Sequence, residues 1–287
     1  MSTAYLLIAH GSRDPRPQAA MNRLVQIVRQ RLASDQPSPV DPALEYRQLA
    51  AVGAEDATSV LLPRKTESLT AAAPGQEVWA SRVNEVVVGT AMLEFAPLPL
   101  HEQIYEFGRR LSAAGIKVLK IVPLFLLRGK HVMEDIPEEV AKAQQRLQGR
   151  LHIDITNHVG EHQQRLQQLI EQRFWGCPTA GRLIVAHGSR RPRGNRMVTA
   201  LGRSLGVEVA YWAPEPTVET QVIQLMQQGC STLTILPYFL FPGGITDAIA
   251  HLTEELAERF PRVTFRLLPP LGATPELAEL AVHSLVD

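Results

Sequence analysis

Two histidines and one glutamate stand where apolar runs end, and together they could hold a divalent metal. His10 follows the run Leu-Leu-Ile-Ala, Glu94 follows Thr-Ala-Met-Leu, and His131 opens a stretch whose apolar residues have helical spacing. Neutral imidazole binds cobalt, iron, nickel and zinc, and a carboxylate serves as a third ligand or as a base. A histidine at such a turn can instead cap a helix or bond a carbonyl, so the metal site depends on the three side chains converging.

Cationic side chains border the same positions. Arg13 follows His10, and Arg128 and Lys130 precede His131. Guanidinium and ammonium groups bind the carboxylates of a ligand, although charges beside helix starts are often only solvated. We expect these three side chains to bind an anionic substrate, with a solvated rim as the alternative.

The chain contains two copies of one pattern. Residues 7–16 match residues 184–193, with Ala-His-Gly-Ser-Arg in both, and residues 121–126 match residues 235–240. Because the matches occur in the same order, they predict a duplicated domain. The first copy is longer, mostly at about 34–81, where we expect a surface insertion, with a lid over a site as the alternative.

Each copy alternates short apolar runs with segments of helical spacing. The expected strands lie near 4–9, 84–90, 117–123 and 151–156 in the first copy, and at 182–186, 207–212, 232–237 and 263–267 in the second. The expected helices of the first copy lie near 17–33, 99–114, 134–148 and 162–174. This alternation predicts an α/β protein of two tandem domains, residues 1–176 and 181–287, each a small parallel sheet flanked by helices.

The predicted topology brings the metal-ligand candidates together. Ligands of open parallel sheets bind beyond the carboxyl ends of the strands, where His10, Glu94 and His131 would all lie. In the second copy His187 persists, but aligning the Ala-Pro-x-Pro segments places Tyr211 opposite Glu94, and Ile245 stands opposite His131. The second copy is therefore predicted to be a degenerate site.

Composition and missing motifs exclude several functions. Lysine plus arginine and aspartate plus glutamate number 29 each, so the net charge of zero does not favour nucleic-acid binding. The apolar runs are too short for a membrane span or a signal peptide, so we expect a cytoplasmic protein. Neither Cys177 nor Cys230 lies near the ligand candidates. The sequence lacks the phosphate-loop and nucleophile-elbow patterns that follow strands in nucleotide-binding proteins and hydrolases.

The combined pattern resembles a known family. Ala-His-Gly-Ser-Arg after the first strand, Leu-Glu94 with prolines after the second, and Pro-Leu-Phe-Leu-Leu-Arg-Gly-Lys-His131-Val-Met-Glu-Asp-Ile-Pro after the third are similar to the class II chelatases, specifically the sirohydrochlorin cobaltochelatases and ferrochelatases. In this resemblance His10 and His131 match the family's two histidines, and Glu94 matches its acidic residue. The two-copy form is similar to long chelatases that keep one working site in the N-terminal half.

The resemblance implies a lyase that inserts Co²⁺ or Fe²⁺, with Ni²⁺ as a further candidate, into the tetrapyrrole sirohydrochlorin on the way to sirohaem or cobalamin. The divalent metal is then a substrate, and no organic cofactor is expected. His10, Glu94 and His131 would be metal ligands and catalytic groups, with the division between ligand and base left open. We expect a monomer in which the two repeats form the substrate cleft. The alternative is a protein that carries a metal or tetrapyrrole without catalysing insertion.

Overall fold

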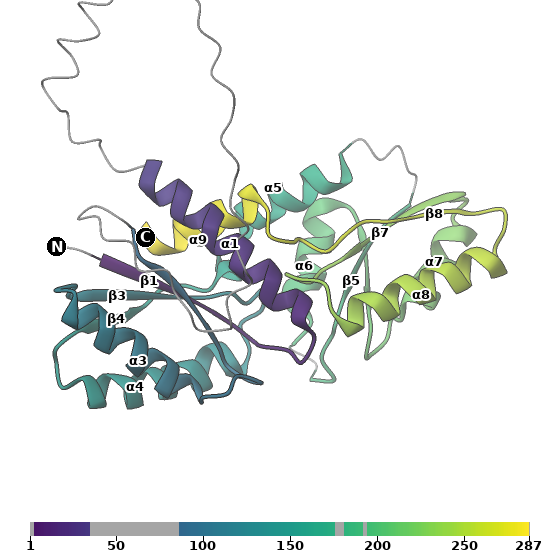
Figure 1. The fold of residues 1–287 in the computed structure, drawn as a ribbon. Helices are drawn as coiled ribbons and strands as arrows, with labels where there is room; N and C mark the ends of the chain where they lie inside the picture. The colour runs from purple at the N-terminus through teal and green to yellow at the C-terminus, as the bar shows by residue number, and fades with distance from the viewer. Residues whose placement is uncertain (1–2, 35–85, 176–180, 192–193, 287) are drawn as a thin grey trace, which may run out of the picture.

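Two parallel sheets form the centre of the protein (Figure 1). The computed structural model describes residues 3–34, 86–175, 181–191 and 194–286. Within them, each sheet has four strands. The N-terminal sheet has the order β2-β1-β3-β4 and the C-terminal sheet the order β6-β5-β7-β8. The strands are β1 (Thr3–Ala9), β2 (Val88–Met92), β3 (Val118–Pro123), β4 (His152–Ile155), β5 (Gly181–Ala186), β6 (Glu208–Tyr211), β7 (Thr232–Pro237) and β8 (Thr264–Leu267).

Helices alternate with these strands, as the sequence predicts. Their apolar residues are spaced to form one stripe: in α3 the buried side chains include Leu100, Ile104, Phe107 and Leu111. The helices are α1 (Pro15–Ser34), α3 (Leu100–Ala113), α4 (Ile136–Leu147), α5 (Gln163–Phe174), α6 (Arg196–Leu205), α7 (Val218–Gln227), α8 (Gly244–Arg259) and α9 (Pro275–Val286), with a π-helical turn η1 (His131–Asp135) and a 3₁₀ turn η2 (Val159–Glu161). The expected α/β fold of two tandem units is confirmed.

The two faces of each sheet pack into different cores. Leu6 and Ile8 of β1 lie in a core with side chains of α3 and α4, whereas Leu7, between them, points to the opposite face. The C-terminal sheet likewise packs Leu183 and Val185 with α7 and α8. Strands that are apolar on both faces are typical of parallel sheets covered by helices on both sides.

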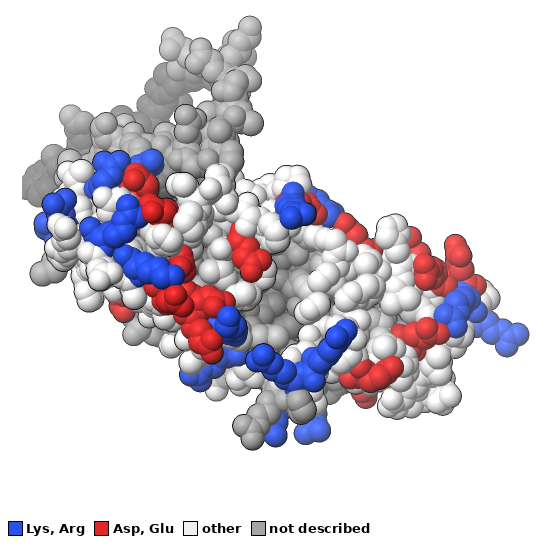
Figure 2. Space-filling model, turned by 90° about the horizontal axis from the view of Figure 1, so that it is seen from below, with Lys and Arg blue, Asp and Glu red and all other residues white. Residues whose placement is uncertain are grey.

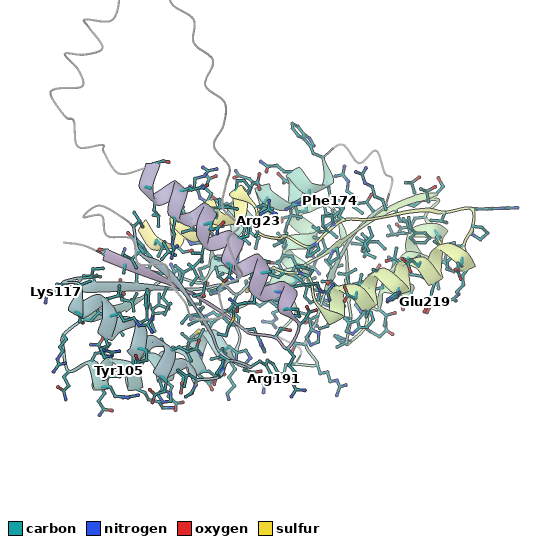
Figure 3. All side chains as sticks on the ribbon, in the orientation of Figure 1. Arg23, Tyr105, Lys117, Phe174, Arg191 and Glu219 are labelled. Atoms are coloured by element: carbon teal, nitrogen blue, oxygen red, sulfur yellow. The ribbon has the colours of Figure 1, made fainter. Side chains whose placement is uncertain are left out.

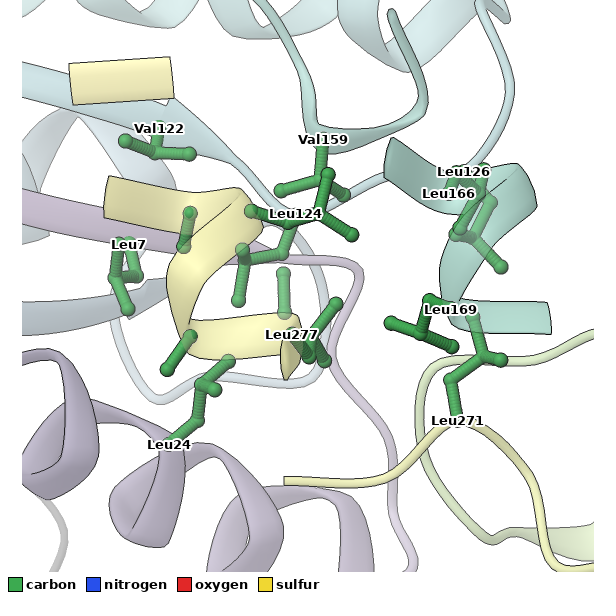
Figure 4. Packing of buried hydrophobic residues seen from close by; sticks show 14 of the residues in the cluster. Leu7, Leu24, Val122, Leu124, Leu126, Val159, Leu166, Leu169, Leu271 and Leu277 are labelled. Atoms are coloured by element: carbon green, nitrogen blue, oxygen red, sulfur yellow. The ribbon is translucent and has the colours of Figure 1, made fainter. Parts of the chain in front are cut away.

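The inner faces of the two sheets share a single core. Helix α9 follows β8 of the C-terminal sheet, yet it packs against α1 and β3. Helix α5 follows β4 of the N-terminal sheet and packs against α6 and α9. Figure 4 shows Leu277 of α9 among Leu7, Leu24 and Val122 of the N-terminal half. Each half therefore contributes a helix to the packing of the other.

The register of the strands brings the carboxyl ends of β1, β2 and β3 to the same edge of the N-terminal sheet. Ala9 pairs with Met92, and Ile8 pairs with Pro123. With this register β2 ends at Met92, two residues beyond residue 90, where the sequence predicts its end. The loops that follow β1, β2 and β3 therefore begin at one edge of the N-terminal sheet. The expected insertion at about 34–81 lies outside the described residues except for Ser34, the last residue of α1. Among the described helices, none is long and apolar enough to cross a membrane.

Candidate metal centre

The three ligand candidates meet at the carboxyl edge of the N-terminal sheet. One ligand atom from each of His10, Glu94 and His131 lies within 4.8 Å of the other two. The His10 Nδ1 atom is 3.9 Å from the Glu94 carboxylate, and the two imidazole rings meet edge to face with centroids 4.9 Å apart. Ligand atoms ~2.0–2.2 Å from a metal ion stand roughly 3–3.5 Å apart in tetrahedral geometry. A contraction of about 1 Å would thus let all three bind one ion.

A glycine allows the first two ligands to approach each other. The Glu94 backbone N–H donates to the His10 carbonyl at 2.8 Å. Gly11 has a φ of +95°, and a Cβ atom there would lie 2.0 Å from the Glu94 carbonyl oxygen. Glycine is therefore required at this position, both for the backbone conformation and for the close packing of the two loops.

The π-helical turn presents His131 in a fixed orientation. The His131 Nδ1 atom lies 2.7 Å from Asp135, and because a carboxylate only accepts, Nδ1 donates. The Nε2 atom is then the one available to a metal. The bond to His131, together with the charge of Lys130 at 3.4 Å, holds the pKa of Asp135 below its usual range. The sequence prediction missed Asp135: it stands four positions after His131, but that spacing alone does not indicate the bond, which depends on the conformation of the turn.

The three predicted cationic residues are exposed beside the cluster: Arg13 and Arg128 lie in loops, and Lys130 directly precedes η1. The Arg13 guanidinium lies over the Phe95 ring, 5.4 Å from its centroid. The Arg128 Nε atom donates to the Met133 sulfur at 2.9 Å. Lys130 instead pairs with Asp135, and its positive charge therefore favours the ionised carboxylate that accepts the hydrogen bond from His131.

The C-terminal half lacks two of the three groups, but one predicted alignment is wrong. The Glu94 N–H donates to the carbonyl of His10, and the Ala213 N–H donates to that of His187. Ala213, and not Tyr211, therefore corresponds to Glu94. Tyr211 ends β6 with its side chain buried and its hydroxyl 2.8 Å from Thr199. The Ala-Pro-x-Pro segments misled the alignment because the loops after the two strands differ in length. Either alignment leaves the second copy without the carboxylate.

An arginine joins the two halves at the same edge. Arg16, at the start of α1, donates to Asp247 of α8 at 2.9 Å and also pairs with Asp14. Its hydrogen bonds lower the pKa of both carboxyls.

Arg191, which follows β5, lies at the lower centre of Figure 3. Seen from below, acidic and basic side chains are intermixed on this face (Figure 2).

A pocket of about 280 Å³ adjoins the cluster; it is lined by Leu93, Glu94, Pro99, Leu100, His131, Asp135, Glu138 and Glu139. Burial would raise the pKa of Glu139, but hydrogen bonds from Lys142 and His101 outweigh it and lower the value to about 2. The pocket therefore has an acidic wall on the side of α4.

Comparison with known proteins identifies the family of the chain. The CbiX family model matches residues 62–175 and again residues 181–287. The chain belongs to the CbiX family. A sirohydrochlorin cobaltochelatase of Priestia megaterium is 22% identical over 67% of the chain, and the chloroplastic sirohydrochlorin ferrochelatase of Arabidopsis thaliana is 31% identical over 32% of it. These alignments span 66% and 45% of the two relatives, less than two thirds of each.

The fold of this CbiX protein is also similar to solved structures. The structure of SirB from Bacillus subtilis with Fe³⁺ superposes with a TM-score of 0.67 at 18% identity, covering 99% of this chain and 94% of SirB. The SirB chelatase of the subspecies spizizenii, in complex with cobalt, gives a TM-score of 0.61 at 18% identity, with the same coverage of both chains. At this identity the likeness establishes the chelatase-like fold.

Proposed function

We propose that this CbiX protein inserts a divalent metal into sirohydrochlorin, with Co²⁺ or Fe²⁺ as the metal substrate and Ni²⁺ as a further candidate. The observation that carries the proposal is the convergence of His10, Glu94 and His131 at one sheet edge. The family and the named activities of its relatives support it. The proposed reaction needs no organic cofactor and belongs to sirohaem or cobalamin synthesis.

The residue types suit this reaction. Insertion exchanges two pyrrole N–H protons of the macrocycle for the metal, so the site must hold a metal loosely and also accept protons. Imidazole and carboxylate groups do both near neutral pH. Because His131 donates from Nδ1 to Asp135, its Nε2 lone pair can bind the metal or take a pyrrole proton. His10 and Glu94 supply the remaining ligand and base positions.

The charged rim suits the second substrate. Sirohydrochlorin has eight carboxylate side chains, and Arg13, Arg128 and Lys130 lie exposed beside the cluster. In this proposal they bind substrate carboxylates. Residues 1–176 hold the working site, and the repeat at 181–287 forms the other wall of the cleft. A monomer suffices, since Arg16 and Asp247 already join the halves at this edge.

The test is steady-state insertion of Co²⁺ or Fe²⁺ into sirohydrochlorin, followed by the optical spectrum with enzyme limiting. His10→Ala and His131→Ala should each lower the turnover rate by at least ~10²-fold while the protein stays folded, because each removes a ligand or base. His187→Ala is the matched control, since it alters the corresponding histidine of the degenerate repeat, and it should be far milder.

Three results would contradict the proposal. Binding of both substrates without turnover would indicate the carrier alternative. Near-normal turnover in either folded variant, or damage by His187→Ala as severe as that by His10→Ala, would contradict the single site in the N-terminal half.

A further inference from the structure

Phe95, the residue after Glu94, has an unusual backbone and an exposed ring. Its φ is +58°, in the left-handed region that a bulky side chain rarely adopts. Gln148, another described non-glycine residue with positive φ, caps the end of α4, which is an ordinary place for this conformation. Phe95 has no such role, and it is 56% exposed. A strained backbone that presents an aromatic ring to solvent calls for an explanation.

The packing of the two metal-ligand loops accounts for the strain. The N–H groups of Leu93 and Glu94 donate to the carbonyls of Ala9 and His10, and Gly11 packs on the Glu94 carbonyl. These contacts fix the chain up to Glu94, so Phe95 must turn immediately after it. A glycine or asparagine would make this turn more readily. Phenylalanine is therefore not the residue that the turn itself favours.

A second exposed apolar side chain lies in the π-helical turn that presents His131. Met133, two positions after His131, is 48% exposed. Each of the two is in contact with an arginine: Arg13 lies over the Phe95 ring, and Arg128 donates to the Met133 sulfur. An apolar side chain in contact with an arginine thus follows Glu94 in its loop, and another follows His131 in its turn.

We propose that Phe95 and Met133 contact the flat face of the tetrapyrrole while Arg13 and Arg128 bind its edge carboxylates. A tetrapyrrole has apolar, aromatic faces and an anionic rim, which matches an apolar side chain paired with a guanidinium. Single exposed apolar residues are common on protein surfaces. At Phe95, however, the exposure coincides with strain, and both Phe95 and Met133 contact an arginine beside the proposed metal ligands. The inference rests on the proposed function, because it assumes that sirohydrochlorin is the substrate.

The decisive variant is Phe95→Gly, which removes the ring and also relieves the backbone strain. We expect the melting temperature to be unchanged or higher, the dissociation constant for sirohydrochlorin to rise about tenfold, and that for Co²⁺ alone to change less than twofold. Phe95→Asn, which also tolerates positive φ, should behave in the same way and covers failure of the glycine variant to fold. Phe95→Trp should keep the wild-type affinity within about threefold.

Trp175→Ala is the matched control. Trp175 is 85% exposed and lies beside Arg182, at the amino end of β5 and thus at the opposite edge of the sheets. Its removal should leave both dissociation constants unchanged. Met133→Ala should weaken sirohydrochlorin binding about threefold, and the Phe95→Gly/Met133→Ala double variant should weaken it further.

The outcomes separate this inference from the proposed function. Wild-type affinity for sirohydrochlorin in folded Phe95→Gly overturns the inference alone, as does an equal loss of Co²⁺ affinity, which would mean that Phe95 acts through the metal cluster. A wild-type protein that binds sirohydrochlorin through Phe95 without inserting metal overturns only the proposed function. A wild-type protein that does not bind sirohydrochlorin overturns both.

Discussion

The side chains of the candidate metal site differ in how firmly the fold holds them. His131 is 34% exposed and bonded to Asp135, whereas the His10 side chain is 51% exposed and lies 3.9 Å from Glu94. Rotation of an exposed side chain disturbs fewer contacts than rotation of one held by a hydrogen bond. We therefore expect the cluster to close around a metal mainly through movement of His10, with His131 as the fixed ligand.

Asp135 should matter to metal binding through its hydrogen bond with His131. Partners that orient a ligating histidine typically contribute 10–100-fold to metal affinity. We expect Asp135→Ala to weaken Co²⁺ binding by roughly tenfold or more, because His131 loses its fixed tautomer and orientation. Asp135→Asn should lose less, since the amide oxygen can still accept from Nδ1.

Direct titration with Co²⁺ measures this effect, with the melting temperature of each variant as a check on folding. Glu134→Ala is the control, because Glu134 is exposed in the same π-helical turn. An Asp135→Ala protein that is folded and binds Co²⁺ as the wild type does would show that His131 needs no such support.

At the scale of elements, α4 stabilises the start of α3. Glu139 of α4 accepts hydrogen bonds from the backbone N–H and the Nδ1 atom of His101, in the first turn of α3, and from Lys142. The first N–H groups of a helix have no partner within the helix. A carboxylate from a neighbouring helix supplies one here, and it joins the two helices that cover the outer face of the N-terminal sheet.

This contact predicts a pH-dependent stability. The pKa of Glu139 is lowered from 4.5 to about 2, so its stabilisation is present above pH 4.5 and is lost as the pH falls toward about 2. Glu139→Gln should lower the melting temperature at pH 7 by about 2–4 °C, as expected for a lost helix cap.

The difference between wild type and Glu139→Gln should shrink in thermal scans taken from pH 5 down to pH 3. Glu138→Gln, on the same helix and paired only with Lys142 among its described contacts, should change the melting temperature little. A Glu139→Gln deficit that stays constant over this pH range would show that the carboxylate charge is not what stabilises the contact.

Much of the fold and part of the site can be predicted from the sequence, for identifiable reasons. Buried parallel strands give apolar runs, and strand ends that share an edge place His10, Glu94 and His131 together. The role of Asp135 could not be predicted without knowing that its turn is π-helical. The error at Tyr211 arose because loop length is weakly constrained, so matching proline segments need not occupy matching positions.

At the scale of the whole molecule, the exchange of α5 and α9 was not predictable. The apolar stripe of α9 includes Leu277, Ala281 and Leu285, and such a stripe does not by itself indicate which sheet the helix covers. Only the packing against α1 and β3 shows which sheet it covers. Each half thus has its own sheet, but the two halves share one hydrophobic core.

This sharing predicts a stability effect that crosses between the halves. Leu277→Ala should destabilise the protein by about 2–5 kcal/mol, as expected for a fully buried leucine. Hydrogen exchange should show the largest loss of protection in β1 and β3, because α9 packs on the N-terminal sheet.

Leu256→Ala is the matched control, since Leu256 is also fully buried, in α8 on the outer face of the C-terminal sheet. Leu256→Ala should reduce hydrogen-exchange protection mainly in β5 and β7 instead. If Leu277→Ala opened only the C-terminal strands, the two halves would not depend on each other in this way.

The position of α9 also determines when the N-terminal half can be completed during synthesis. Leu7 and Val122 leave the ribosome long before Leu277, yet they share a core with it. Until residues 275–286 emerge, the inner face of the N-terminal sheet lacks one of its covering helices. Until then the nascent chain presents an apolar surface, and the helix that covers it comes from the copy that lacks counterparts of Glu94 and His131.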